Sequence, residues 1–215
     1  MRQNEQLVDL TRPLSEQTPV YPGDPSFRVA VAHEAGDVGF RLAQVTTGLH
    51  VGTHLDAPRH FFAAGSGVDG IAIAKTVGRA NLIRVTPHDG IVRTADLAAA
   101  WERLCERTPR LLVSTGWERR FGETDFFTGH PGFEPSLFAF LKERDIVLLG
   151  VDMPSVKYGK SDNAACHSDL LGAGIVVVET LCALEGLPPA FFLSCAPLPL
   201  VGLDGSPVRA YAIVA

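Results

Sequence analysis

Three histidines and one aspartate lie close together in the sequence, with a spacing that suits metal binding. All four are in the segment His50-Val51-Gly52-Thr53-His54-Leu55-Asp56-Ala57-Pro58-Arg59-His60. Alternate side chains of an extended chain point to the same face, so His50, His54 and Asp56 would project together. Imidazoles and carboxylates are typical zinc ligands, and an ion with an open coordination position can ionise a bound water molecule.

The first two histidines of this segment can share one ion only if the chain bends between them. In an ideal strand His50 and His54 would lie about 13 Å apart, near the limit for two imidazoles on one ion. Gly52 lies between them, and its lack of a Cβ both permits a bend and leaves space for an ion against the backbone. The surrounding threonines, glycines and proline argue against the helical two-histidine motif of zinc proteases.

The end of the segment offers a bridging ligand and a proton carrier. Asp56 adds an oxygen ligand whose second oxygen could bridge to a second ion. Pro58 ends the extended stretch, so that His60 emerges beyond the ligands but near them. Histidine titrates near neutral pH, and we therefore predict that His60 is the general acid and base.

Two further ligand candidates stand far along the chain. Glu179 ends the apolar run 175–178, where an unpaired carboxylate would be costly unless it is neutralised or coordinated. His167 precedes this run, in a segment rich in residues that favour turns. The remaining histidines, His33, His88 and His130, stand in contexts typical of loops, and we predict that they lie on the surface.

The elements that must position these residues are mostly strands. Two helices are predicted, one beginning with Thr94 as N-cap and ending before Pro109, and one over 135–144. Irregular structure is predicted for 117–132 and 153–174. The sequence favours one mixed α/β domain over residues 1–215, with a mixed sheet and few helices. The predicted strands cover 7–10, 27–32, 42–47, 81–86, 111–115, 146–151, 175–178 and 191–194.

Composition excludes several classes of partner. The net charge is −5 and the basic residues form no stripe, so no nucleic acid is expected. No apolar run reaches the length of a membrane span, and the first residues are polar, so we expect a cytoplasmic protein that does not bind membranes. The four cysteines form no close pair, which predicts reduced thiols packed in the core.

The histidine segment resembles the H-x-G-T-H-x-D-x-P-x-H signature of the cyclase family, which includes the bacterial kynurenine formamidases. Three further stretches resemble the same family, so the similarity extends over nearly the whole chain. The resemblance implies a swivelling β/β/α-type fold, commonly found in homodimers or larger assemblies. These stretches are Asp9-Leu10-Thr11-Arg12-Pro13-Leu14, Thr18-Pro19-Val20-Tyr21-Pro22-Gly23-Asp24 and Gly150-Val151-Asp152-Met153-Pro154-Ser155.

The resemblance also implies a role for each candidate residue. Two divalent ions, zinc or in some relatives manganese, would be bound, with Asp56 bridging them. His60 would be the proton donor and acceptor. Tyr21 stands where kynurenine formamidases typically have a tryptophan, and it could still stack on an aromatic substrate. The implied metal ligands are His50, His54 and Asp56 for the first ion, His167 for the second and Glu179 for both.

The activity implied is hydrolysis of N-formyl-L-kynurenine or a similar aryl formamide to an amine and formate. Three alternatives stay open. The same chemistry could open a cyclic amide or lactone such as isatin. His50, His54 and Asp56 could instead be the two-histidine, one-carboxylate set of a mononuclear iron oxygenase. A metal-binding module without catalysis is the third, although it would have no use for His60.

Overall fold

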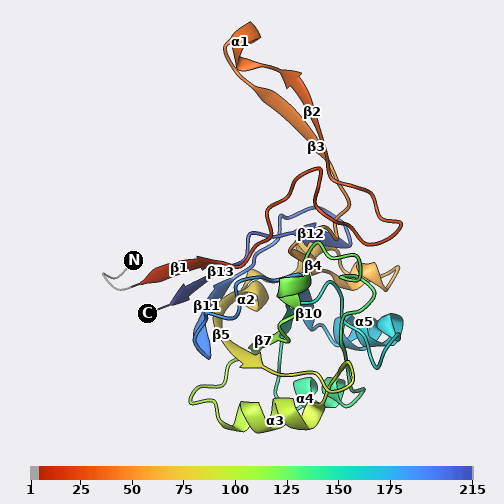
Figure 1. The fold of residues 1–215 in the computed structure, drawn as a ribbon, viewed down its shortest axis with the longest axis vertical. Coiled ribbons are helices and arrows are strands. Elements are labelled where there is room, and N and C mark those ends of the chain that lie inside the picture. The colour runs from red at the N-terminus through yellow and green to blue at the C-terminus, as the bar shows by residue number, and fades with distance from the viewer. Residues whose placement is uncertain (1–4, 215) are drawn as a thin grey trace.

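The computed structural model describes residues 5–214 of the chain and is built on a nine-stranded mixed sheet (Figure 1). Its four central strands, β5, β7, β9 and β10, run parallel, and the strands on both sides of them are antiparallel to their neighbours. In spatial order the strands are β1 (Gln6–Asp9), β13 (Tyr211–Val214), β11 (Ala190–Ser194), β5 (Val77–Arg84), β7 (Arg110–Ser114), β9 (Leu148–Val151), β10 (Val176–Glu179), β4 (His54–Asp56) and β12 (Gly205–Pro207).

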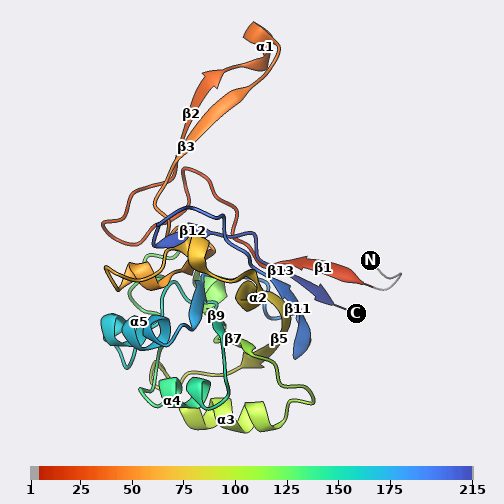
Figure 2. The same ribbon diagram turned by 180° about the vertical axis from the view of Figure 1, so that it is seen from behind.

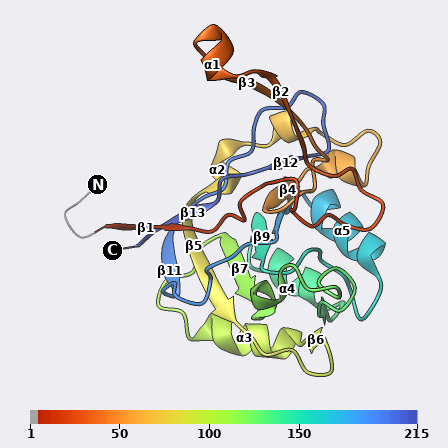
Figure 3. The same ribbon diagram turned by 45° about the horizontal axis from the view of Figure 1, so that its top comes forward.

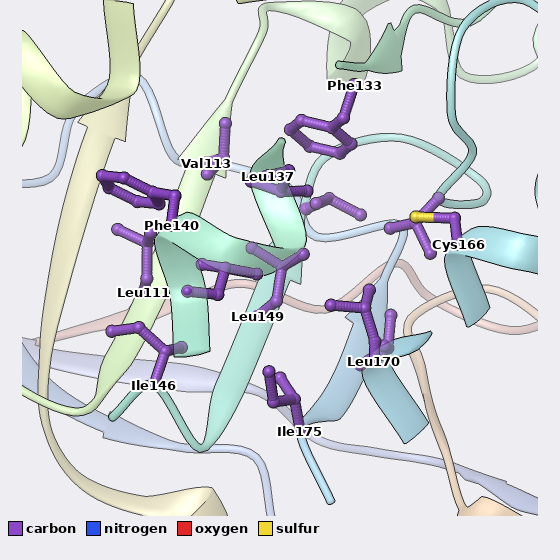
Figure 4. Close-up of a cluster of buried hydrophobic side chains, with 14 of the residues drawn as sticks. Leu111, Val113, Phe133, Leu137, Phe140, Ile146, Leu149, Cys166, Leu170 and Ile175 are labelled. Atoms are coloured by element: carbon purple, nitrogen blue, oxygen red, sulfur yellow. The ribbon is translucent and has the colours of Figure 1, made fainter. Parts of the chain in front are cut away.

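Apolar side chains alternate between the two faces of the central strands, and each face is buried. Leu111 and Val113 of β7 pack on one face and Leu112 on the other. Helices α3 (Thr94–Glu102), α4 (Leu137–Lys142) and α5 (Asn163–Gly172) contribute to the first cluster, in which Phe140 and Leu170 surround Leu149 (Figure 4). Strands that are buried on both faces are expected to have continuous apolar sequences, as these strands do.

The opposite face is covered mainly by segments without long helices. Leu10, which follows β1, and Phe191 of β11 belong to this second cluster. The short helix η2 (Val68–Gly70) contributes Val68 to this cluster. The other short helices are α2 (Ile73–Thr76), η1 (Pro58–His60) and η3 (Trp117–Arg120). A small separate sheet pairs β6 (Ile91–Val92) with β8 (Gly132–Phe133).

A hairpin arm, residues 28–46, projects away from the body of the molecule (Figures 1 and 2). It consists of β2 (Arg28–His33) and β3 (Leu42–Thr46), with the short helix α1 (Ala35–Val38) at its tip. Every residue of the two strands is exposed. In the tilted view of Figure 3 the arm also stands clear of the sheet and its covering helices.

Most of the predicted elements are confirmed, and the mixed α/β class is confirmed with them. All eight predicted strands form, with bounds shifted by a few residues. Both predicted helices form as α3 and α4, although Arg93 rather than Thr94 is the N-cap of α3. Within the described residues no helix has the length and apolar character needed to cross a membrane.

Three sequence predictions are wrong. Residues 153–174 are not irregular throughout, because Asp162 accepts a hydrogen bond from Ala165 N and caps helix α5. His130 is buried rather than on the surface, with an exposed fraction of 5%. Cys105 is exposed and Cys182 half-buried, so only two of the four cysteines are core residues.

Candidate metal centre

Strand β4 carries two of the five candidate ligands, His54 and Asp56, to the edge of the parallel strands. It pairs antiparallel with β10, which places His54 directly opposite Glu179 and Asp56 opposite Val177. Side chains directly opposite each other on neighbouring strands lie within contact distance. This pairing therefore brings two segments together that are more than a hundred residues apart in sequence.

The chain bends sharply before β4, so the extended segment predicted from His50 to Asp56 is only extended from His54. Gly52 has a φ of +56°, a left-handed conformation that favours glycine. The predicted bend is confirmed, but the space beside Gly52 is not open to an ion. A Cβ at this position would lie 2.6 Å from Cδ2 of Leu14. As a result of the bend, Nδ1 of His50 lies 2.7 Å from Oδ1 of Asp56.

His54, Asp56, His167 and Glu179 form one cluster, and each is almost completely buried. Nε2 of His54 lies 3.3 Å from Oε2 of Glu179 and 3.5 Å from Oδ1 of Asp56. Nε2 of His167 lies 3.2 Å from Oε1 of Glu179 and 3.5 Å from Oδ2 of Asp56. Both imidazoles therefore face the same two carboxylates.

Backbone carbonyls fix the direction in which these two imidazoles point. Nδ1 of His54 donates to the carbonyl oxygen of Gly52 at 2.9 Å, and Nδ1 of His167 donates to that of Asn163 at 2.9 Å. In a neutral ring Nε2 then carries the lone pair, and it faces carboxylate oxygens that can only accept. Lone pairs facing each other in this way require a proton or a metal ion between them.

The carboxylates make this site favourable for positive charge. Burial by itself would lower the pKa of His50 and His167, but the carboxylates that face these rings, Asp56 and for His167 also Glu179, outweigh it. The pKa of His50 rises to about 9 and that of His167 to about 10. Despite burial, the imidazoles of His167 and His50 that face it keep the pKa of Asp56 well below its ordinary value. A divalent cation bound here would be stabilised by the same carboxylates that stabilise these protons.

One buried oxygen of the cluster has no hydrogen-bond partner and is suited to coordinate a cation. Oδ2 of Asp56 is buried and has no hydrogen-bond partner among the described residues. The 3.5 Å to Nε2 of His167 exceeds the length of a good hydrogen bond. Potential ligand atoms converge in two groups that share Asp56, one with His54 and Glu179 and one with His50 and His60. The residues present therefore fit a metal cofactor.

His60 lies beside this cluster, in η1, which begins at Pro58. Its ring stacks on that of His50, with centroids 4.0 Å apart and planes inclined by 28°. Burial lowers the pKa of His60, so its ring stays neutral at neutral pH and can accept a proton. Potential ligand atoms of His60, His50 and Asp56 lie within 4.8 Å of one another, so His60 would lie close to an ion held by Asp56.

The structure adds Asp204, which sequence reasoning missed. It stands in the turn before β12, and its Oδ2 lies 3.0 Å from Nε2 of His50. Nothing in its sequence neighbourhood, Val201-Gly202-Leu203-Asp204-Gly205, distinguishes it from an ordinary turn aspartate. Only the pairing of β12 with β4 brings this aspartate to the histidine segment.

A cavity of about 680 Å³ opens onto the cluster. Four histidines and Glu179 line it, together with the aromatic rings of Tyr21, Phe61, Phe121, Phe126 and Phe127. Tyr21 lines this cavity and packs edge-on against Phe127, with ring centroids 5.8 Å apart. Phe126 continues the row, in contact with both Phe127 and Phe121. These phenylalanines come from the loop after η3, which was predicted to be irregular and functional but not assigned to the site.

The sequence of the chain matches the family model described as "Putative cyclase" over residues 8–158. The chain belongs to the cyclase family. This cyclase-family chain is 34% identical to a protein named kynurenine formamidase from Geobacillus thermodenitrificans, over 94% of this chain and 95% of that one. A kynurenine formamidase of Polaromonas naphthalenivorans is 31% identical over 95% of this chain and 89% of its own length.

Solved structures agree with this assignment. Isatin hydrolase A from Ralstonia solanacearum superimposes on this cyclase-family chain with a TM-score of 0.87 at 28% identity, covering 100% of this chain and 94% of that one. Isatin hydrolase A from Labrenzia aggregata, bound to benzyl benzoate, gives a TM-score of 0.85 at 27% identity, with 98% and 94% covered. The cyclase-family chain is thus an amide-bond hydrolase by its relatives and its fold.

Proposed function

We propose that this chain, as one domain over residues 1–215, hydrolyses aryl formamides, with N-formyl-L-kynurenine as the first substrate to test. The single observation that carries the proposal is the buried cluster of imidazoles and carboxylates in a cavity that aromatic rings also line. The similarity to kynurenine formamidases over nearly the whole chain supports the same reaction.

The ligand set suits two divalent ions, zinc in the first place and manganese as the alternative. Asp56 would bind both ions, since potential ligands from both groups converge on it. His50 and His54 would complete the first site with Asp56, and His167 would bind the second. Glu179 lies against both His54 and His167, which supports its proposed bridging role. When bound, the ions would supply an ionised water at neutral pH and polarise the carbonyl oxygen.

The chain's own residues then handle the proton. Water adds to the formyl carbon, the carbon–nitrogen bond breaks, and the departing nitrogen must gain a proton to leave as a neutral amine. His60 is neutral because burial lowers its pKa, so it can take the proton of the attacking water and deliver it to this nitrogen. The products are the aryl amine and formate.

The aromatic wall selects and orients the substrate. The edges and faces of Tyr21 and Phe127 can pack on an aryl ring, and such aromatic pairs contribute beyond the area that they bury. Phe61, which stacks on His167 at the inner end, excludes water from the reacting atoms. Tyr21 is 45% exposed and lies at the cavity's rim, where it can contact substrate without blocking entry.

A substrate panel tests the reaction and its main alternative. The structural similarity to isatin hydrolase A favours opening of a cyclic amide as the second candidate. Purified protein with excess zinc or manganese should be assayed on N-formylkynurenine, formanilide and isatin. Faster turnover of both formamides than of isatin would support the proposal. Turnover of isatin alone would replace the proposed reaction with opening of a cyclic amide.

Metal analysis tests the ligand set separately. Two zinc or manganese ions per chain are expected after loading and gel filtration. One iron per chain, together with oxygen-dependent activity, would instead favour a mononuclear oxygenase. His167 and Glu179 argue for hydrolysis, because an oxygenase site of His50, His54 and Asp56 has no role for either residue.

The hairpin arm supports assembly into a homodimer. Val29, Val31 and Val45 lie on one face of the arm and are 39–53% exposed, with Ala43 paired opposite Val31. A lone two-stranded hairpin is marginally stable in water, and an exposed apolar face usually marks an interface. A second copy, packing symmetrically on the first, would cover it.

Charge placed on the arm tests the dimer. Val31→Lys together with Val45→Lys should yield monomers in light scattering after gel filtration. Gln44→Lys, on the opposite face of the same arm, is the matched control and should leave the dimer intact. The four free cysteines accord with our proposal of a cytoplasmic location, where thiols stay reduced.

A further inference from the structure

Asp204 is an acidic residue of the cavity wall that neither the family signature nor the proposed ligand set uses. It is contributed by the turn before β12, far in sequence from the histidine segment. Its side chain is 38% exposed and turned toward the cavity, so that it borders the space that substrate would enter.

A single oxygen of this carboxylate faces two imidazoles. Oδ2 lies 3.0 Å from Nε2 of His50 and 3.5 Å from Nδ1 of His60. These two rings are the stacked pair at the edge of the metal cluster. A carboxylate between two ring nitrogens fixes both the orientation of the rings and the position of their protons.

The turn that carries Asp204 is rigidly built. The carbonyl oxygen of Asp204 accepts a hydrogen bond from Ala57 N at 2.9 Å, and the carbonyl oxygen of Leu203 accepts one from Val68 N at 2.8 Å. Asp69 accepts from Gly202 N at 2.8 Å. Gly205 follows directly, and a Cβ there would lie 2.8 Å from Cε1 of His50. The backbone thus approaches the His50 ring as closely as a glycine allows.

We propose that Asp204 is a positioning residue that fixes the stacked imidazoles of His50 and His60 and orients His60 for proton transfer. The carboxylate of Asp204, 3.5 Å from Nδ1 of His60, favours the tautomer with its proton on Nδ1, which leaves the lone pair of the neutral ring on Nε2. The inference rests on the proposed hydrolysis, in which His60 carries the proton.

Kinetics of a double-mutant cycle test whether Asp204 acts through His60. With metal in excess, Asp204→Ala should lower kcat about 10–100-fold, as loss of a supporting carboxylate typically does, with KM nearly unchanged. In a His60→Ala background the same change should alter kcat less than about twofold. An equal loss in both backgrounds would overturn the proposal.

Asp69→Ala is the matched control for the turn itself. It removes the acceptor for Gly202 N but leaves the Asp204 carboxylate, and it should keep kcat near that of the parent protein. If Asp69→Ala reproduces the loss, Asp204 matters only through the shape of the turn. Asp204→Asn should fall between Asp204→Ala and the parent, because its amide oxygen can still accept one hydrogen bond.

Nitrogen NMR of histidine rings gives a readout that does not depend on activity. In the zinc-loaded protein labelled with ¹⁵N-histidine, His60 should show a protonated Nδ1 and an unprotonated Nε2. Asp204→Ala should convert this signal to a mixture of both tautomers, whereas Asp69→Ala should not. An unchanged His60 tautomer in Asp204→Ala would refute the positioning role. Absence of turnover by the parent protein on every panel substrate would instead refute the proposed function.

Discussion

Replacing Gly52 with alanine should destabilise the bend that brings His50 to Asp56. The residue has a φ of +56°, and a Cβ there would lie 2.6 Å from Cδ2 of Leu14. A left-handed conformation costs an L-residue roughly 1–2 kcal/mol. Crowding of a packed side chain adds roughly 1–3 kcal/mol. The free energy of unfolding should therefore fall by about 2–5 kcal/mol in total.

Urea denaturation of matched variants separates the two costs. Gly90 also has a positive φ, +77°, but a Cβ there meets nothing within 4 Å, so Gly90→Ala should show the conformational cost alone. Leu14→Ala, added to Gly52→Ala, should recover the crowding cost. Equal losses in Gly52→Ala and Gly90→Ala, or no recovery with Leu14→Ala, would refute this reasoning.

The same variant should also lose metal. Unless the Leu14 side chain turns away, the backbone between His50 and His54 must shift, which would move His50 away from Asp56. Zinc content after dialysis should thus fall in Gly52→Ala and recover in part when Leu14→Ala is added. Gly90→Ala, far from the histidine segment in sequence, should retain its zinc.

Three further predictions concern the cluster, the cavity and the buried His130. Asp56→Asn should weaken zinc binding by more than about 100-fold in competition with a chelator, since even supporting residues cost 10–100-fold. Phe127→Ala should raise KM for aryl formamides about 2–10-fold, with kcat nearly constant, because it removes an aromatic contact of roughly 0.5–1.5 kcal/mol. Burial, assisted by Lys157, lowers the pKa of His130 to about 4 from its ordinary 6.5. Acidification from about pH 7.5 to about pH 5 protonates this histidine in the unfolded chain only, which should cost about 2 kcal/mol of stability. In His130→Gln the loss of stability over the same pH range should be smaller by that amount than in the parent protein, as measured by denaturation at each pH.

The local half of the site could be predicted because its geometry follows from neighbouring residues. His54 and Asp56 lie two residues apart on one short strand. Gly52, just before them, adopts the left-handed conformation that bends the chain and that glycine tolerates. Glu179 could be suspected from a local conflict, a carboxylate at the end of an apolar strand. In each case the signal lies within a few residues of the ligand.

The remaining features depend on packing that no short segment encodes. Asp204 reaches His50 only because β12 pairs with β4, and that register is a property of the whole sheet. The polar run around Asp162 was predicted as a loop, yet the same residues cap a helix whose other side packs on the core. His130 is likewise buried by distant segments, which its neighbours in sequence do not reveal.

The ligand cluster and the cavity wall have different parts in the proposed chemistry. In the proposed reaction the cluster around Asp56 would hold the metal that supplies the nucleophile, and this role is the same for an open formamide and for a ring amide. Selection between these substrates must come from the cavity wall, where Tyr21, Phe126 and Phe127 are contributed by loops outside the histidine segment. Loops of this kind vary more readily than a buried ligand cluster on strands. Under the proposed function one metal centre could serve both reactions, and the aromatic wall would determine this chain's own substrate.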